Sequence, residues 1–278
     1  MTITMNDLEG FTTSLRLDEK SKATMEKYRA DAGEFIAWLD GRELTKDETI
    51  RWKEHLCGKD IVPGTVNSKL NALNSLLGYM GREDCKVKFL KIQHQPFREP
   101  KKEMTWEEYQ RLQDAAKKKG DTRMSMVMET IVATGIRVSE LKFITVEAAQ
   151  TGRAIVNMKG KIRTVLITDS LAKKLLNYAK GRKIASGPIF ITRNGNPMGR
   201  KQIWSKMKAF CAEAGVDSSK VFPHNLRHLF ARLHYKRYHN IVSLADILGH
   251  SSIETTRIYL VTTGKEYAKQ LEALRLVS

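Results

Sequence analysis

The chain has 278 residues, more than a single hydrophobic core usually serves, so we expect two domains. Its composition, 41% hydrophobic and 28% charged, is that of a globular protein and excludes collagen-like and disordered chains, and no apolar run is long enough to span a bilayer. The 48 basic against 31 acidic side chains indicate a polyanionic partner, above all nucleic acid, while three scattered cysteines favour neither a metal site nor disulfides.

The first 95 residues are predicted to form a small bundle of helices. Apolar residues recur at helical spacing in residues 25–39 and 66–80, and Thr45 with Glu48 forms a capping box that opens another helix. This segment carries 15 basic and 15 acidic side chains, so the whole positive excess lies in the rest of the chain. Four basic residues nevertheless crowd one helix, either as a solvated surface or as a DNA contact: Lys20, Lys22, Lys27 and Arg29.

Residues 96–103 carry two prolines and no apolar periodicity, which indicates a linker between a helical domain, 1–95, and a second domain, 104–278. In the second domain, Thr105 and Glu108 form another capping box, and helices are expected near 124–134 and 138–143. Two β-branched runs flank the tripeptide Lys-Gly-Lys at 159–161 and predict a hairpin. The expected fold is therefore mainly α with a small β-sheet.

Three short motifs follow one another in the second domain. ATGIRVSEL places an arginine after a glycine turn, where the first backbone N–H groups of a helix favour anions. PHNLRH opens a helix at its proline and puts a histidine and an arginine three residues apart, on one face. LGHSS puts a histidine between two helices, and a tyrosine follows nine residues later. The candidate residues are Arg137, His224, Arg227, His250 and Tyr259.

Each motif taken alone is more simply explained as a basic helix face or a core aromatic residue. Their order, with the lysine-bearing hairpin between the first two, resembles the catalytic domain of tyrosine recombinases, the phage integrase family, and especially its Xer-like and mobile-element integrase branch. The likeness covers most of residues 104–265, and the N-terminal helices are compatible with the family's core-binding domain.

The resemblance implies a C-shaped clamp around duplex DNA, with a helical core-binding domain and a catalytic domain that contains a three-stranded sheet. It implies site-specific recombination without ATP, metal or another cofactor, through a Holliday junction. The protein would be a monomer in free solution and a homotetramer on synapsed sites, with accessory DNA-bending proteins among its candidate partners. We expect a cytoplasmic, nucleoid-associated protein and no membrane.

The resemblance and elementary chemistry together assign roles to the candidate residues. A phenol with a pKa near ~10 needs help to attack at neutral pH, and Tyr259 is the nucleophile that forms a 3′-phosphotyrosyl link. Arg137 and Arg227 would fork onto the scissile phosphate and stabilise its transition state. His250 would donate a further hydrogen bond, and His224 would accept the tyrosine proton or bind phosphate.

A lysine in the hairpin would protonate the departing 5′-hydroxyl. The family's hairpin commonly reads Gly-Lys-Gly, whereas Met158 replaces the first glycine here and the turn is one residue shorter. We favour Lys159 for this role over Lys161, because a glycine still follows it. Lys161 and Arg257 are candidate DNA contacts, and Glu140 would orient the site rather than transfer protons.

One enzymatic alternative and two binding alternatives compete with this interpretation. A type IB topoisomerase would use the same chemistry to relax DNA, and a noncatalytic regulator would be expected to lack the tyrosine or an arginine. A ribosomal or RNA-binding protein would explain the charge but not the ordered motifs. Tyr267, Leu271 and Leu274 form one apolar face of a C-terminal helix, which packs on its own domain or docks into a neighbouring protomer.

Overall fold

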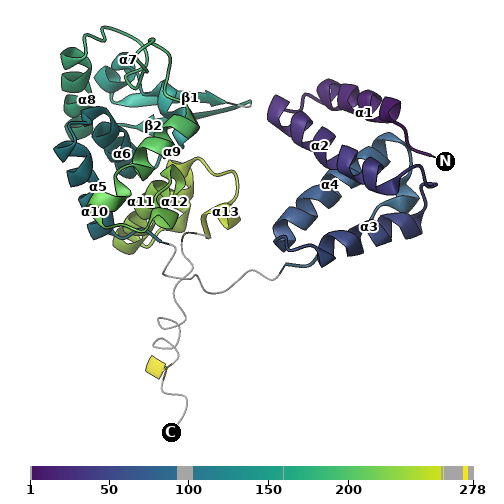
Figure 1. Ribbon diagram of the computed structural model, residues 1–278. Helices are drawn as coiled ribbons and strands as arrows, with labels where there is room; N and C mark the ends of the chain where they lie inside the picture. Colours follow the sequence, from purple (N-terminus) through teal and green to yellow (C-terminus); the bar gives the residue numbers. More distant parts are fainter. Residues whose placement is uncertain (1, 93–102, 159, 258, 260–271, 275–278) are drawn as a thin grey trace. The chain divides into compact units, whose positions relative to one another are not determined.

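The computed structural model describes residues 2–92, 103–158, 160–257, 259 and 272–274 (Figure 1). The chain divides into two compact units, Met1–His94 and Gln95–Ser278. All but one residue of the predicted linker, 96–103, lies outside the described residues. Among the described helices, none has the length and apolar character needed to cross a membrane.

The first unit is helical, and its helices begin where the sequence predicted. The Thr45 hydroxyl accepts a hydrogen bond from the Glu48 N–H at 3.3 Å, and Pro63 occupies the first turn of another helix. The apolar faces of these helices pack around Phe35, Trp52 and Leu73, which are buried. The elements are α1 (Met5–Leu17), α2 (Lys22–Leu39), α3 (Lys46–Gly58), α4 (Pro63–Tyr79) and η1 (Glu83–Cys85).

The basic residues around α2 are all exposed but do not form one continuous basic face. Lys20 precedes the helix, whereas Lys22 and Arg29 lie seven residues apart and share a face. Lys27 lies on another part of the helix surface and pairs with Asp31 at 2.6 Å. Contact of these residues with DNA stays a prediction.

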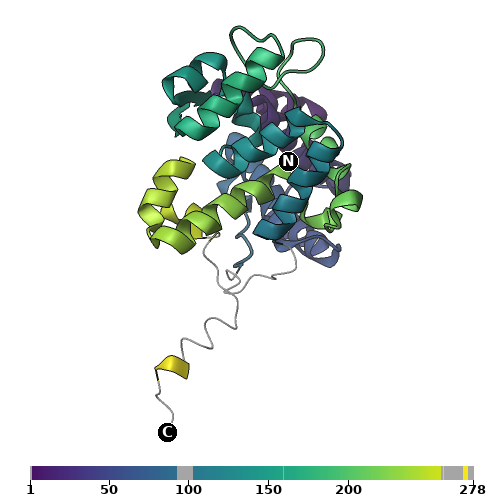
Figure 2. The ribbon, with the colours of Figure 1, turned by 90° about the vertical axis from the view of Figure 1, so that its left-hand side faces the viewer.

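The second unit places one long helix, α11, between α6 and α12 (Figure 2). The capping box predicted at the first helix of this unit is confirmed, because Thr105 and Glu108 exchange hydrogen bonds of 2.8 and 3.2 Å. Its elements are α5 (Trp106–Lys118), α6 (Thr122–Thr134), η3 (Val138–Phe143), α7 (Val146–Thr151), β1 (Arg153–Met158), β2 (Lys161–Leu166), α8 (Asp169–Gly181), α9 (Arg200–Lys208), α10 (Cys211–Ala214), η4 (Ser218–Lys220), α11 (Pro223–Tyr238), α12 (Ile241–Leu248) and α13 (Ile253–Arg257).

The predicted hairpin is confirmed, and the sheet of the described residues has two strands instead of the three implied by the resemblance. A further segment makes an isolated bridge between Thr145 and Pro188, flanked by two hydrogen bonds of 3.0 Å, from the Val146 N–H to the Gly187 carbonyl and from the Ile189 N–H to the Ile144 carbonyl. In the hairpin, Val156 lies opposite Arg163 on the inner face, while Ile162 and Leu166 are exposed. The strand thus turns an arginine inward and aliphatic side chains outward.

Candidate active site

Arg137 follows a glycine that the fold requires. Gly135 ends α6 in the left-handed conformation, at φ 63°, and a Cβ there would lie 2.5 Å from Phe230. The chain then turns so that Arg137 directly precedes η3, with its N–H donating to Glu140 Oε2 at 2.9 Å and its Nη1 to Oε1 at 3.0 Å. The Arg137 side chain stays 39% exposed, so the guanidinium is held at its base and open to solvent.

Glu140 is buried and binds a second arginine, Arg163 of β2. Arg163 Nη2 donates to Glu140 Oε2 at 2.6 Å, and its Nη1 donates to the Ile247 carbonyl at 3.1 Å. Burial raises the pKa of Glu140, but the hydrogen bonds from Arg163 and Arg137 outweigh burial and hold the pKa below its usual value. The carboxylate is therefore ionised, and it lies behind Arg137, away from open solvent, as the orienting role predicted for Glu140 requires.

Arg227 is almost fully buried, with 1% of its surface exposed. It lies on α11, and its guanidinium donates to the carbonyls of Gly135 and Leu248, the latter at 2.8 Å, and to His250 Nε2 at 2.9 Å. These acceptors are uncharged, and no carboxylate of the described residues pairs with Arg227. Burial, with the nearby charge of Arg137, lowers the pKa of Arg227 to about 10. The group remains a cation at neutral pH, without a counter-ion.

His250 lies at the predicted junction between helices. Gly249 ends α12 at φ 63°, and the Ser252 hydroxyl accepts from the Glu254 N–H at 3.2 Å at the start of α13. Because a guanidinium only donates, His250 Nε2 accepts from Arg227, and Nδ1 carries the proton and donates to Thr256 Oγ1 at 2.9 Å. Burial and the charges of Arg227 and Arg137 lower the pKa of His250 to about 4, so the ring is neutral at pH 7.

Tyr259 packs between two histidine rings and is 4% exposed. Its ring stacks on His250, with centroids 5.8 Å apart and planes 16° apart, and meets His228 edge-on at 4.6 Å. A hydrogen bond between the phenol and Arg227 raises the pKa of that arginine against the effect of burial. The structure thus brings Tyr259, His250 and Arg227 together.

His228 and Arg163 were given no role from the sequence, although each carries a signal. His228 lies one helical turn after His224, with ring centroids 4.4 Å apart, and therefore on the same side of α11. Arg163 lies at an inward position of a strand, where a charged residue needs a partner. The order of the motifs alone did not draw attention to either residue.

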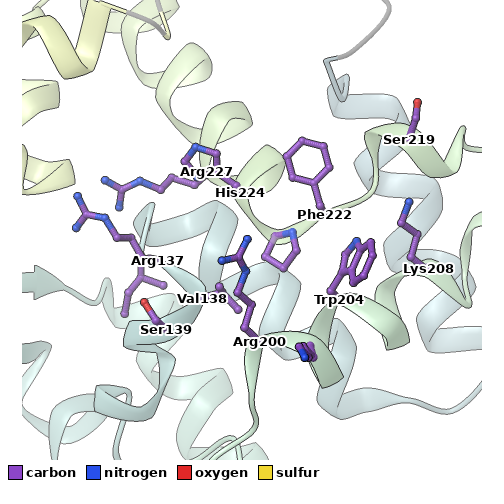
Figure 3. Close-up of a pocket in the computed structure, with 13 residues that line it drawn as sticks. Arg137, Val138, Ser139, Arg200, Trp204, Lys208, Ser219, Phe222, His224 and Arg227 are labelled. Atoms are coloured by element: carbon purple, nitrogen blue, oxygen red, sulfur yellow. The ribbon is translucent and has the colours of Figure 1, made fainter. Parts of the chain in front are cut away.

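Two cavities meet at Arg137. One, of about 660 Å³, is lined by Arg137, His224 and Arg227, and the guanidinium groups of the two arginines converge at one end of it (Figure 3). The other, of about 670 Å³, is lined by Arg137, Glu140, Arg163 and His250. A ligand that reaches Arg137 from either side therefore meets a wall that is rich in arginine and histidine.

The sequence and fold of the whole chain match known proteins. The model of the Phage integrase family matches residues 102–265, more than half of the chain. The chain belongs to this family. It is 28% identical to the tyrosine recombinase XerA of Pyrococcus furiosus over 97% of this chain and 94% of that protein.

Solved structures with similar folds are also recombinases. The XerH site-specific recombinase bound to its difH substrate has a TM-score of 0.70 and 19% identity, and the match covers 96% of this chain and 84% of that one. A lambda integrase tetramer bound to a Holliday junction has a TM-score of 0.72 and 18% identity over 93% of this chain and 77% of that one. The predicted family and the mainly helical fold with a small sheet are confirmed, and the protein is a tyrosine recombinase, an enzyme that cleaves and rejoins DNA.

Other predicted site residues of this recombinase are less completely described. Lys159 lies outside the described residues, and Lys161 begins β2. Arg257 ends α13, is exposed and pairs with Glu254 at 3.1 Å. Two of the three residues that define the predicted C-terminal helix, Tyr267 and Leu271, lie outside the described residues.

A basic helix beside the site was also missed from the sequence. α9 carries four basic residues among nine, and its exposed Trp204 and the ammonium of Lys208 lie 5.6 Å apart, measured to the ring centroid. The cavity that contains Arg137 and Arg227 is also lined by Arg200, Trp204 and Lys208 (Figure 3). The dense basic composition of this short helix was the available signal.

Proposed function

We propose that this recombinase is site-specific, cuts each DNA strand with Tyr259 and rejoins it without ATP or metal. The observation that carries the proposal is the buried cation of Arg227, whose hydrogen-bond partners among the described residues are all uncharged and include the phenol of Tyr259. A buried charge is normally paired, and a phosphate oxygen would provide the missing counter-ion next to the nucleophile.

The reaction exchanges one phosphate ester for another. The phenolic oxygen of Tyr259 forms a bond to phosphorus, and the bond from phosphorus to the 5′-oxygen breaks. His224 takes the phenolic proton, and a hairpin lysine, Lys159 in preference to Lys161, gives a proton to the 5′-oxygen. Arg137 and Arg227 hold the non-bridging oxygens as charge develops on them. Attack by another 5′-hydroxyl reverses the same steps and needs no added energy source.

His250 would change its hydrogen bonding during this cycle. In the free protein its Nε2 accepts from Arg227, so it cannot donate to phosphate in that arrangement. A phosphate oxygen that takes over Arg227 Nη2 would release Nε2, and transfer of the ring proton from Nδ1 to Nε2 would make His250 the predicted donor. Thr256 accepts from Nδ1 in the free protein and would donate its hydroxyl proton afterwards.

Duplex DNA is the proposed substrate, enclosed by the two units as a C-shaped clamp. The exposed basic side chains of Lys22, Arg29, Arg200 and Lys201 are suited to contact its phosphates. We further propose a monomer in solution that assembles as a homotetramer on two synapsed sites in the cytoplasm, with or without DNA-bending proteins. The lambda integrase tetramer on a Holliday junction, which shares this fold, supports that assembly.

Covalent trapping tests the proposal and supplies the recombination site. The protein is first used to select binding sequences from a randomised duplex pool, which are then nicked next to each candidate position to prevent religation. Wild-type protein should remain attached to one of these duplexes on a denaturing gel, whereas Tyr259→Phe should bind it equally well and form no covalent complex. A covalent complex with Tyr259→Phe would refute the assignment of the nucleophile.

The same duplexes test the clamp and the competing function. Arg137→Ala should cleave at least about 10²-fold more slowly, the scale for loss of a group that stabilises a transition-state oxyanion. Near-normal single-turnover cleavage would place Arg137 outside the site. Exchange of strands between two linear site-bearing duplexes distinguishes recombination from a topoisomerase, which would relax supercoiled DNA without exchanging partners.

A further inference from the structure

The carboxylate of Glu140 is shared between two arginines that both line a cavity, and of the two Arg137 leaves much more of its side chain open to solvent. Arg137 is 39% exposed at its side chain, whereas Arg163 is 13% exposed. We propose that Arg163 is a positioning residue for the cleavage reaction. It supplies the counter-ion of Glu140, so that the charge of Arg137 remains available to the scissile phosphate.

The hydrogen-bond lengths show which arginine holds Glu140 more closely. Arg163 Nη2 lies 2.6 Å from Oε2 and its Nε lies 3.5 Å from Oε1, whereas Arg137 Nη1 lies 3.0 Å from Oε1. Arg137 also satisfies Oε2 through its backbone N–H at 2.9 Å, a bond that positions the residue without using its side-chain charge. Arg163 is therefore the main counter-ion of the carboxylate.

Arg163 itself is not placed to bind the phosphate. Each of its three nitrogens is bonded inside the protein, two to Glu140 and Nη1 to the carbonyl of Ile247 at 3.1 Å. Gly249 packs so closely on it that a Cβ at that position would lie 2.2 Å from Arg163 Cδ. The arginine is thus fixed between β2, η3 and the end of α12, directly before His250.

The charges of this group explain why the second arginine matters. Two guanidinium groups and one carboxylate leave a net positive charge beside the phosphate position, and Arg227 adds another. Without Arg163, Arg137 and Glu140 would form a neutral pair, and the carboxylate would both draw Arg137 inward and repel the phosphate. If the negative charge of Glu140 is removed together with Arg163, the positive charge of Arg137 should again act on the phosphate. A purely structural role of Arg163 does not predict this recovery.

The test rests on the proposed role of Arg137 at the phosphate and compares single-turnover cleavage of two substrates. One is the trapped duplex with its normal scissile phosphate, and the other carries a methylphosphonate there, which removes one charged oxygen. Arg163→Met should cleave the phosphate at least about tenfold more slowly, within the range for weakened oxyanion stabilisation. On the methylphosphonate it should stay within about threefold of wild type, because less negative charge needs stabilising.

Two further variants examine the charge directly. Adding Glu140→Gln to Arg163→Met should recover most of the lost rate on the phosphate substrate. Arg153→Met, which removes an exposed arginine from the neighbouring strand, should cleave both substrates like wild type. Should Arg163→Met fail to fold by circular dichroism, Arg163→Lys and Arg163→Gln replace it. The lysine variant should then cleave the phosphate faster than the glutamine variant.

Several results would overturn the inference. They are an equal loss of rate on both substrates, a double variant slower than Arg163→Met, normal cleavage by Arg163→Met, and equal rates of the lysine and glutamine variants. Arg137→Met, measured in parallel, separates this from the proposed function. If the cleavage rate of Arg137→Met recovers on the methylphosphonate and that of Arg163→Met does not, only the proposed role of Arg163 is refuted. If Arg137→Met does not recover, its assignment to the phosphate fails and the inference falls with it.

Discussion

Replacing Arg227 by methionine should abolish cleavage while changing the stability of the protein little. Because the pKa of this arginine is lowered from its usual range to about 10, folding disfavours its charged form by about 3 kcal/mol. Because the pKa of a base is lowered, this cost is fully present at every pH below about 10 and is relieved only as the pH rises above that value.

The hydrogen bonds of Arg227 act in the opposite direction. Its guanidinium bonds to two carbonyls and to His250, and each charge-assisted bond of this kind contributes about 1.5–3 kcal/mol net. The cost of burial offsets much of this contribution, so Arg227→Met should lower the free energy of unfolding by less than about 3 kcal/mol. Single-turnover cleavage should fall by at least about 10²-fold.

Urea denaturation and cleavage of the trapped duplex measure both quantities, and Arg232 on the same helix provides the control. Arg232 pairs with Glu103 at 2.7 Å, so Arg232→Met should lose about 1.5–3 kcal/mol, the range for a charge-assisted bond, and still cleave. Inorganic phosphate should raise the melting temperature of wild type more than that of Arg227→Met. A loss of more than about 3 kcal/mol in Arg227→Met would show that Arg227 is a structural cation and refute this reasoning.

Three further changes give distinct expectations. Gly249→Ala should reduce stability and cleavage more than Gly215→Ala. Both glycines have left-handed backbones, but a Cβ at 249 would overlap Arg163, whereas a Cβ at 215 would have no atom within 4 Å. Equal effects of the two substitutions in urea denaturation and cleavage assays would contradict this. The melting temperature of the wild type should fall as the pH drops from 6.5 toward 4, because His250 binds a proton more readily in the unfolded state than in the folded one. His250→Asn should flatten this dependence on pH. Parallel pH profiles of the two proteins would show that His250 does not cause it. Deleting residues 265–278 should leave site binding intact and slow recombination of two sites, a proposal that full-rate exchange by the truncated protein would contradict.

The sequence predicts helices well where a cap and an apolar face coincide. Thr45 and Thr105 begin helices as expected, and Pro223 opens α11, because these local signals act within one turn. The third strand was not found in the described residues, where the segment at Pro188 makes a single bridge to Thr145. Local patterns do not report which distant segment a strand will meet.

The candidate site was predicted in its membership more fully than in its bonding. Motif order identified Arg137, Arg227 and Tyr259, but it could not reveal that His250 accepts from Arg227, which depends on the packing of α11 against α12. Arg163 lies 23 residues from its partner Glu140, and only the folded hairpin brings them together. Ion pairs over such separations are set by tertiary structure and leave little trace in a local pattern.

The burial of Tyr259 bears on how the enzyme avoids damaging the genome. With 4% of its surface exposed between His228 and His250, the Tyr259 side chain is shielded from most of its surroundings in this conformation. We expect the ring to leave both histidines before it cuts, with the energy for this step supplied by the bound target DNA. Accidental nicking is thereby suppressed in the resting protein, and target choice becomes a matter of which DNA can draw the nucleophile out as well as which DNA is bound.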